Sequence, residues 1–228
     1  MATYVVRVWV PDRPGALGSV ASRIGAVRGD LVGIDILERG AGLAIDELVV
    51  QLPDDENLVP LLLHEIGEVD GVAVEDIHKV KGGLPPDPRL AALETAGVLV
   101  EQRTQDDLLH ALATHAAHDF GAGWATVLGE EEPVVRAAVG ACPPVPWTTA
   151  FMAGSRTVDT DLLAGSGGGP EDMGWARLER ARLDLVLGRP GRPIRSRERQ
   201  QLAALVRVAD VRWEELSPAG RSAAGRSR

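Results

Sequence analysis

The chain has 228 residues, of which 45% are hydrophobic and 25% charged, and its mean hydropathy is close to zero. That much apolar surface can form a core, so wholesale disorder is excluded. The formal net charge of −9 disfavours nucleic acid as a partner, because duplex-binding proteins usually carry a basic excess. No stretch is apolar over a membrane-spanning length and the N-terminus does not read as a signal peptide, so we expect a cytoplasmic protein with no membrane partner.

Residues that could support catalysis or metal binding are sparse. The single cysteine, Cys142, excludes an internal disulfide, a cysteine-rich zinc site and an iron–sulfur cluster. The histidines His110, His115 and His118 have helical spacing but lie away from the apolar helix face, which favours solvated side chains over zinc ligands. The glycine run 165–169 lacks the Gly-Lys-Ser/Thr that completes a phosphate-binding loop. We therefore predict no catalytic residue, no metal and no cofactor.

A proline- and glycine-rich segment, Lys81–Pro88, divides the chain. Such a composition can continue neither a helix nor a central strand. We predict a first domain over residues 1–81, a linker over 82–88, a second domain over 89–216, and a disordered tail over 217–228 with almost no apolar content.

Six elements are predicted in the first domain from the spacing of apolar residues. In chain order they are a strand over Tyr4–Val10, a helix over Leu17–Val27, strands over Leu31–Arg39 and Leu43–Leu52, a helix over Leu58–Val69 and a strand over Val72–Val80. Alternation places Val32, Ile34 and Ile36 on one face of the second strand. The order is βαββαβ, a ferredoxin-like unit.

The second domain reads as a mixture of helices and antiparallel strands. The predicted elements are helices over Leu90–Val100 and Leu108–Phe120, strands over Gly123–Leu128 and Val134–Val139, a strand or two within Thr148–Ala153 and Thr157–Leu163, a strand over Arg182–Leu187, and a last helix capped by Ser196. Thr104 begins the second of these helices as a capping residue. The whole chain is therefore expected to belong to the α+β class.

The turn Asp12-Arg13-Pro14-Gly15-Ala16-Leu17 joins the first strand to the first helix. Gly15 lets a ligand approach the backbone, and the amides of Gly15, Ala16 and Leu17 would lie unpaired at the positive end of the helix. A carboxylate would bind there, while Asp12 would accept a hydrogen bond from an ammonium group. The alternative is that this segment is only a good turn.

The Asp12–Leu17 turn, the Leu17-Gly-Ser-Val-Ala21 run that overlaps it and the βαββαβ order resemble the ACT domain over residues 3 to 80. That resemblance implies a regulatory module that binds an amino acid at a dimer interface. It also implies that the turn of one subunit faces the strand Gly33-Ile34-Asp35 of its partner. Arg13 stands where one form of the family has Asn before the Pro-Gly pair.

A homodimer has separate support in the predicted second strand, whose segment Leu31–Leu37 is apolar and free of proline. In this topology the strand lies at an edge of the sheet, where pairing with its own copy would cover it. The alternative is that the second domain covers this edge.

Residues 88–216 resemble a GAF domain in their opening helices, in the segment Gly123–Leu128, in the strand Ala181–Leu187 and in the run Gly188–Asp210 that leads into the last helix. GAF domains bind small molecules in a cavity and dimerise through outer helices. Since the segment Leu163–Gly169 is short and glycine-rich, a structural or dimerising role is an equal alternative.

These observations predict a non-enzymatic regulatory protein that binds a small molecule, an amino acid, at an ACT dimer interface and passes the signal to an unidentified protein partner. The alternative is an enzyme or a nucleotide-binding signalling protein acting through the GAF-like domain; no nucleophile–base pair is visible in the sequence to support an enzyme. A DNA-linked regulator is disfavoured because no helix-turn-helix pattern is present.

Overall fold

The structure is a computed structural model that describes residues 1–55, 57–80, 82–130, 133–157 and 172–217. The chain divides into two compact units, Met1–Pro86 and Asp87–Arg228. Each unit contains a four-stranded antiparallel sheet with helices, so the α+β class is confirmed. Within the described ranges, none of the helices combines the length and the apolar content that crossing a bilayer requires.

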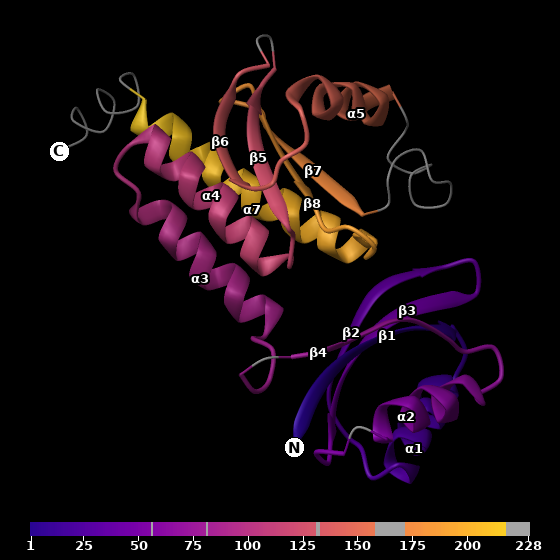
Figure 1. The fold of residues 1–228 in the computed structure, drawn as a ribbon. Coiled ribbons are helices and arrows are strands. Elements are labelled where there is room, and N and C mark those ends of the chain that lie inside the picture. The colour runs from indigo at the N-terminus through magenta and orange to yellow at the C-terminus, as the bar shows by residue number, and fades with distance from the viewer. Residues whose placement is uncertain (56, 81, 131–132, 158–171, 218–228) are drawn as a thin grey trace. The chain divides into compact units, whose positions relative to one another are not determined.

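The first unit has the predicted βαββαβ order. Its elements are β1 (Ala2–Pro11), α1 (Ala16–Ala26), β2 (Asp30–Gly40), β3 (Leu43–Leu52), α2 (Leu58–Gly67) and β4 (Ala73–Lys79). The strand order in the sheet is β2-β3-β1-β4, so that β2 and β4 are the terminal strands. Both helices lie on one face of this sheet (Figure 1).

The core of the first unit lies between the sheet and its two helices. Alternation along β1 turns Val6, Val8 and Val10 toward the helices, and the helices contribute Val20, Ile24, Leu62 and Ile66. All of these side chains are almost fully buried. The face of each strand residue in this unit therefore follows from the register with β1, directly for β3 and β4 and through β3 for β2.

The second unit begins with two helices and continues into the sheet. Its elements are α3 (Pro88–Glu101), α4 (Gln105–Asp119), β5 (Trp124–Gly129), β6 (Val135–Gly140), α5 (Val145–Thr157), β7 (Met173–Leu178), β8 (Leu183–Gly188) and α7 (Ser196–Leu216). The strand order is β6-β5-β8-β7. As predicted, Thr104 caps α4, its Oγ1 accepting from the Asp107 amide at 3.1 Å.

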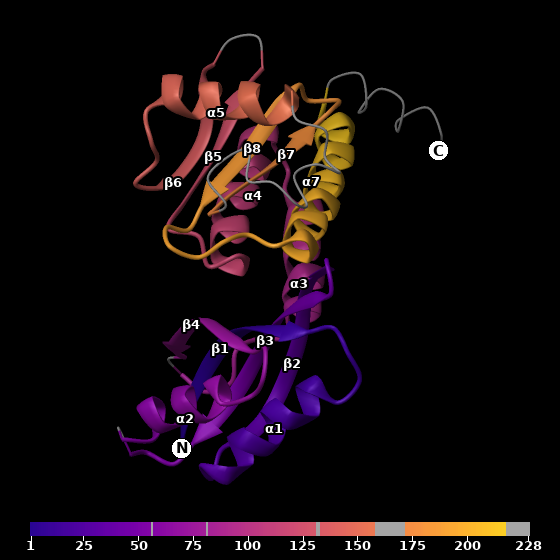
Figure 2. The ribbon, with the colours of Figure 1, turned by 90° about the vertical axis from the view of Figure 1, so that its right-hand side faces the viewer.

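Helices cover both faces of the second sheet. The larger cluster joins α3, α4 and α7 to Val127, Leu185 and other inward residues of β5 and β8, and α7 runs beside β7 (Figure 2). A smaller cluster on the opposite face joins Met152 of α5 to Trp124 and Val186. The unit is thus three layers, with α5 alone among the described helices on its side of the sheet.

Three local predictions in the second unit were wrong. The segment Thr148–Ala153 is helical and lies inside α5, where Met152 packs on the sheet and the Thr148 and Thr149 hydroxyls donate to the carbonyls of Pro144 and Val145, at 3.4 and 2.8 Å. Strand β7 was missed as a separate element, and Ser196 is the first residue of α7 rather than its cap. The cap is Arg195, whose amide donates to Glu198 Oε2 at 2.8 Å. Residues 158–163 and 218–228, for which a strand and a disordered tail were predicted, lie outside the described residues.

Candidate functional site

One end of the first sheet brings together the turn after β1, the last residues of β2 and the first residues of β3. This follows from the antiparallel ladder, in which Val8 lies opposite Asp46, and Asp46 lies opposite Ile36. The Asp12 amide donates to the Gly42 carbonyl at 2.9 Å and so joins the Asp12–Leu17 turn to the turn between β2 and β3. We call this end of the unit the turn site, comprising residues 12–18, Arg39 and Asp46.

The turn leads into α1 through a left-handed residue. Gly15 has φ +88° and is the N-cap of the helix, with no side chain capping it. The Ala16 amide donates to the Arg13 carbonyl at 3.3 Å, so it is bonded, contrary to our prediction for this group. Among the described residues, the amides of Leu17 and Gly18 have no acceptor. As first-turn amides of a helix, they point out of its N-terminal end.

The space beside Gly15 is open. A Cβ atom built at this glycine would meet no heavy atom within 4 Å. Asp12, Pro14 and Gly15 are all exposed, which leaves the N-terminus of α1 accessible from solvent. The positive end of a helix in this state favours an anion.

Arg13 does not fold over the helix N-terminus. Its Nη2 is 3.5 Å from Asp70 Oδ2, in the turn before β4, and both side chains are well exposed. A pair of this kind contributes little to stability, since water screens both charges. The Arg13 guanidinium is therefore engaged on the β4 side of the turn.

Asp46 is a candidate site residue that the sequence analysis missed. It lies in register with Val8, so that it shares the helix-covered face of the sheet, and only 3% of its surface is exposed. Its Oδ1 is buried without a hydrogen-bond partner among the described residues. The signal was present in the sequence, because Asp46 is in phase with the buried Leu48, Val50 and Leu52.

Burial raises the pKa of the Asp46 carboxyl, because the charged form loses its water. The Arg39 guanidinium opposes this effect, and the Asp12 carboxylate adds to it. Asp46 therefore lies within electrostatic reach of both an exposed acid on the turn and an exposed base at the end of β2.

The three predicted site residues of β2 lie on different faces. Ile34 is opposite Leu48 on the helix-covered face and is 46% exposed. Gly33 is opposite Val49 and Asp35 opposite Glu47, on the helix-free face; a Cβ at Gly33 would come within 3.2 Å of Val49. Within one protomer only Ile34 shares the face of Asp46. Contact of these three residues with a partner's turn stays a prediction.

Charged side chains on the helix-free face are paired with one another. Arg7 is almost fully buried, and its Nη2 donates to Glu47 Oε2 at 2.8 Å. Glu75 is 3.8 Å from Arg7 and accepts from Trp9 Nε1 at 3.1 Å. These contacts join β1, β3 and β4, so we assign the group a structural role.

The polar residues singled out in the second unit have structural partners. The Cys142 thiol donates to the carbonyls of Ala125 and Val139, at 3.4 and 3.5 Å, and burial raises its pKa, which disfavours the nucleophilic thiolate. His118 Nδ1 is 3.1 Å from Asp119 Oδ1. Within the described ranges, no group of three or more His, Cys, Asp or Glu residues is arranged to hold a metal ion.

In the segment Gly188–Pro193, which precedes α7, Arg189 has a structural role. Only 5% of this residue is exposed, and its guanidinium donates to the carbonyls of Phe120, Arg192 and Pro193 at 2.9, 2.9 and 2.6 Å. It also pairs with Glu198 at 2.6 Å. Arg189 thus fastens the segment between β8 and α7 to the end of α4.

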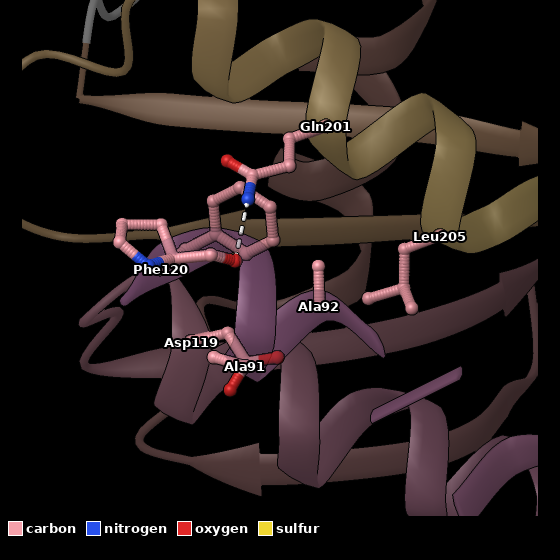
Figure 3. Close-up of a pocket in the computed structure, with 7 residues that line it drawn as sticks. Ala91, Ala92, Asp119, Phe120, Gln201 and Leu205 are labelled. Atoms are coloured by element: carbon pink, nitrogen blue, oxygen red, sulfur yellow. Dashed lines mark hydrogen bonds between the residues drawn. The ribbon is translucent and has the colours of Figure 1, made fainter. Parts of the chain in front are cut away.

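A shallow pocket between α3, α4 and α7 is too small for an organic ligand. It is lined by Ala91, Ala92, Asp119, Phe120, Leu205 and two further residues (Figure 3). Its volume is about 20 Å³, which accommodates about one water molecule. Gln201 Nε2 donates to the Pro88 carbonyl across it at 3.0 Å. The pocket therefore offers no ligand site to compare with the turn site.

Comparison with known proteins does not identify a family. No family model and no curated protein matches the chain. Among solved structures, an uncharacterized protein from Thermotoga maritima is similar at 22% identity and a TM-score of 0.28, over 35% of this chain and 96% of that one. A formyltetrahydrofolate deformylase from Pseudomonas putida KT2440 is similar at 16% identity and a TM-score of 0.29, over 44% of this chain and 38% of the deformylase. An unknown protein from Galdieria sulphuraria is similar at 12% identity and a TM-score of 0.28, over 59% of this chain and 75% of that one. Similarities this low carry no argument about function.

Proposed function

We propose that this chain is a non-enzymatic regulatory protein that binds an α-amino acid at the turn site. The observation that carries the proposal is the combination of an uncapped helix N-terminus with two acids, Asp12 and Asp46. The amides of Leu17 and Gly18 would bind the ligand carboxylate. Asp12 would accept from the ligand ammonium. These two charges stand side by side in every α-amino acid.

The open approach to Gly15 supports binding at this place. A ligand carboxylate can reach the helix N-terminus only where side chains leave room, and no protein atom occupies the position of a Cβ at Gly15. The left-handed backbone of Gly15 also directs the chain into the helix without a capping side chain. The ACT-like identity of the first unit and the GAF-like identity of the second are parts of this proposal.

The proposed assembly is a homodimer formed through β2. This strand is a terminal strand of its sheet and carries the exposed apolar residues Val32 and Ile34. Pairing with a second copy would continue the sheet and cover both side chains. It would also bring the predicted Gly33–Asp35 segment of one copy toward the turn site of the other. The signal would then pass to a protein partner in the cytoplasm.

Calorimetry on the full chain with each of the twenty amino acids tests the proposal. At least one should bind, and it should raise the melting temperature, since a ligand that binds only the folded state stabilises it by mass action. Asp12→Asn should weaken binding because a neutral amide attracts an ammonium group less strongly. Asp54→Asn, an exposed acid before α2, is the matched control. Absence of binding by all twenty would overturn the proposal.

A further inference from the structure

Asp46 is the most unusual group in the turn site. A buried carboxylate is normally paired or hydrogen-bonded, because removing its charge from water is costly. Here 97% of the residue is buried, since 3% is exposed, and Oδ1 has no partner among the described residues. The protein therefore holds an acceptor in place without supplying its donor.

The neighbouring charges leave a negative balance. Arg13 of the turn is paired with Asp70, outside the turn site. The two carboxylates of Asp12 and Asp46 are then opposed by one guanidinium, that of Arg39, and Arg39 is exposed, so that water screens it. The partial positive charge of the α1 N-terminus would be balanced by the carboxylate of the ligand. A zwitterionic amino acid with a neutral side chain would leave one carboxylate unbalanced. A second positive charge on the ligand would balance it.

Depth within the unit separates the two acids. Asp12 lies on the exposed turn, whereas Asp46 lies on the covered face of β3, behind it. The α-amino and α-carboxyl groups of a ligand would stay at the turn, near Asp12 and the helix amides. A ligand side chain directed inward along Ile36, which is opposite Asp46 in register, would bring its end toward the buried carboxylate once the side chains that cover Asp46 move aside.

We infer that Asp46 is a specificity-determining residue that accepts from a cationic side-chain group, so that the turn site takes a basic amino acid. The inference rests on the proposed function, because it assumes that Asp12 and α1 hold the backbone groups of the ligand. An ion pair formed with a desolvated carboxylate is stronger than the same pair in water. A ligand with a neutral side chain would leave Asp46 in its costly, unpartnered state, which is the basis of the discrimination.

The test uses pairs of ligands that differ in one charge. L-lysine is compared with L-norleucine, L-ornithine with L-norvaline, and L-arginine with L-citrulline, by calorimetry on the full chain at neutral pH. We expect at least one cationic member to bind about 10-fold or more tightly than its neutral counterpart, the size of effect typical of a buried charged hydrogen bond.

Two variants assign that preference to Asp46. Asp46→Asn preserves shape and removes the charge, so the preference should fall to within about threefold. Asp54→Asn removes an exposed acid of the same unit and should keep the full preference. If Asp46→Asn is poorly folded by circular dichroism, Asp46→Glu provides the second variant: it keeps the charge, and it should keep the preference for a cation while changing which chain length binds best.

The outcomes separate the two proposals. Equal binding within every pair, or a preference that survives Asp46→Asn, overturns the role of Asp46 and leaves the amino-acid site intact. Failure of all six ligands and of the remaining amino acids overturns the proposed function and the role of Asp46 together. A cation preference that is lost in Asp46→Asn and kept in Asp54→Asn supports both.

Discussion

Replacing Gly15 by valine, compared with a control substitution, distinguishes the loss of ligand binding from the loss of stability that backbone strain causes. Gly15 has φ +88°, and a Cβ atom there would have no heavy atom within 4 Å beyond its two chain neighbours, so the first atom of the valine side chain would meet no steric obstacle. The cost to folding is the left-handed conformation, about 1–2 kcal/mol for a residue with a Cβ. For a unit of this size, that cost corresponds to a fall of roughly 5–15 °C in melting temperature.

Gly191→Val is the matched control for strain. Gly191 has φ +77°, and a Cβ there would also meet nothing within 4 Å, but it lies in the second unit, between β8 and α7. Both variants should lose comparable stability in urea denaturation, each in its own unit. Only the Gly15 variant should lose ligand binding, since its branched side chain fills the approach to the helix amides.

The assay has a large enough signal to decide the matter. A ligand at 100 times its dissociation constant stabilises the folded state by about 2.7 kcal/mol, which exceeds the expected strain. In the Gly15 variant this stabilisation should disappear, and in the Gly191 variant it should remain. Affinity within about threefold of the unsubstituted protein in Gly15→Val would refute the placement of the ligand at this turn.

Three other predictions address assembly, stability and pH. Ile34→Pro should halve the mass measured by light scattering, because proline cannot donate in a ladder through β2, whereas Ile34→Val should leave it unchanged; an unaltered mass in the proline variant would place the interface elsewhere. Arg189→Met should lower the unfolding free energy of the second unit by about 3–5 kcal/mol, since it removes the cation that pairs with Glu198 and the donor of three carbonyls; exposed Arg207→Met should change it by less than about 0.5 kcal/mol. The raised pKa of Asp46 means that the folded state retains a proton that the unfolded state has lost, so its contribution to stability is present below the unfolded pKa and lost as pH rises through the folded pKa. Urea denaturation from pH 4 to 7 should therefore show Asp46→Asn gaining relative to the unsubstituted protein as pH rises, and a constant difference would contradict the burial of a titrating carboxylate.

The elements of the first unit could be predicted because its sequence signals are local and mutually consistent. Alternating valines define β1, glycine and aspartate end α1, and the Gly40-Ala41-Gly42 turn fixes the β2–β3 hairpin. Each predicted boundary lies within two residues of the observed one. The two bulges of β2 were not predictable. The second of them, between Ile36 and Glu38, places Arg39 on the face of Ile34 and Ile36, whereas strict alternation would place it on the opposite face.

The elements of the second unit were harder to predict because the secondary structure that local residues favour differs there from the structure that they form. Thr148, Thr149 and Phe151 favour a strand by propensity, yet they form α5, where Met152 packs on the sheet and the threonine hydroxyls find acceptors within the helix. The glycine and arginine of β7 weaken its strand pattern in the sequence. In the structure β7 pairs with β8, and Met173, Ala176 and Leu178 are buried. Tertiary contacts decided both segments.

Asp46 shows how a site residue can be missed when each strand is assigned without its faces. An aspartate within Leu43–Leu52 is unremarkable if that strand is considered alone, since half of a strand usually meets solvent. Its phase with Leu48, Val50 and Leu52 places it on the buried face, where an isolated carboxylate lowers stability. A sequence that retains a costly acid beside an uncapped helix N-terminus is less stable empty than it would be with a donor bound. The Asp12–Leu17 turn alone is equally consistent with a simple strand-to-helix connection; the buried, unpartnered acid next to it is what favours a ligand with a positive charge.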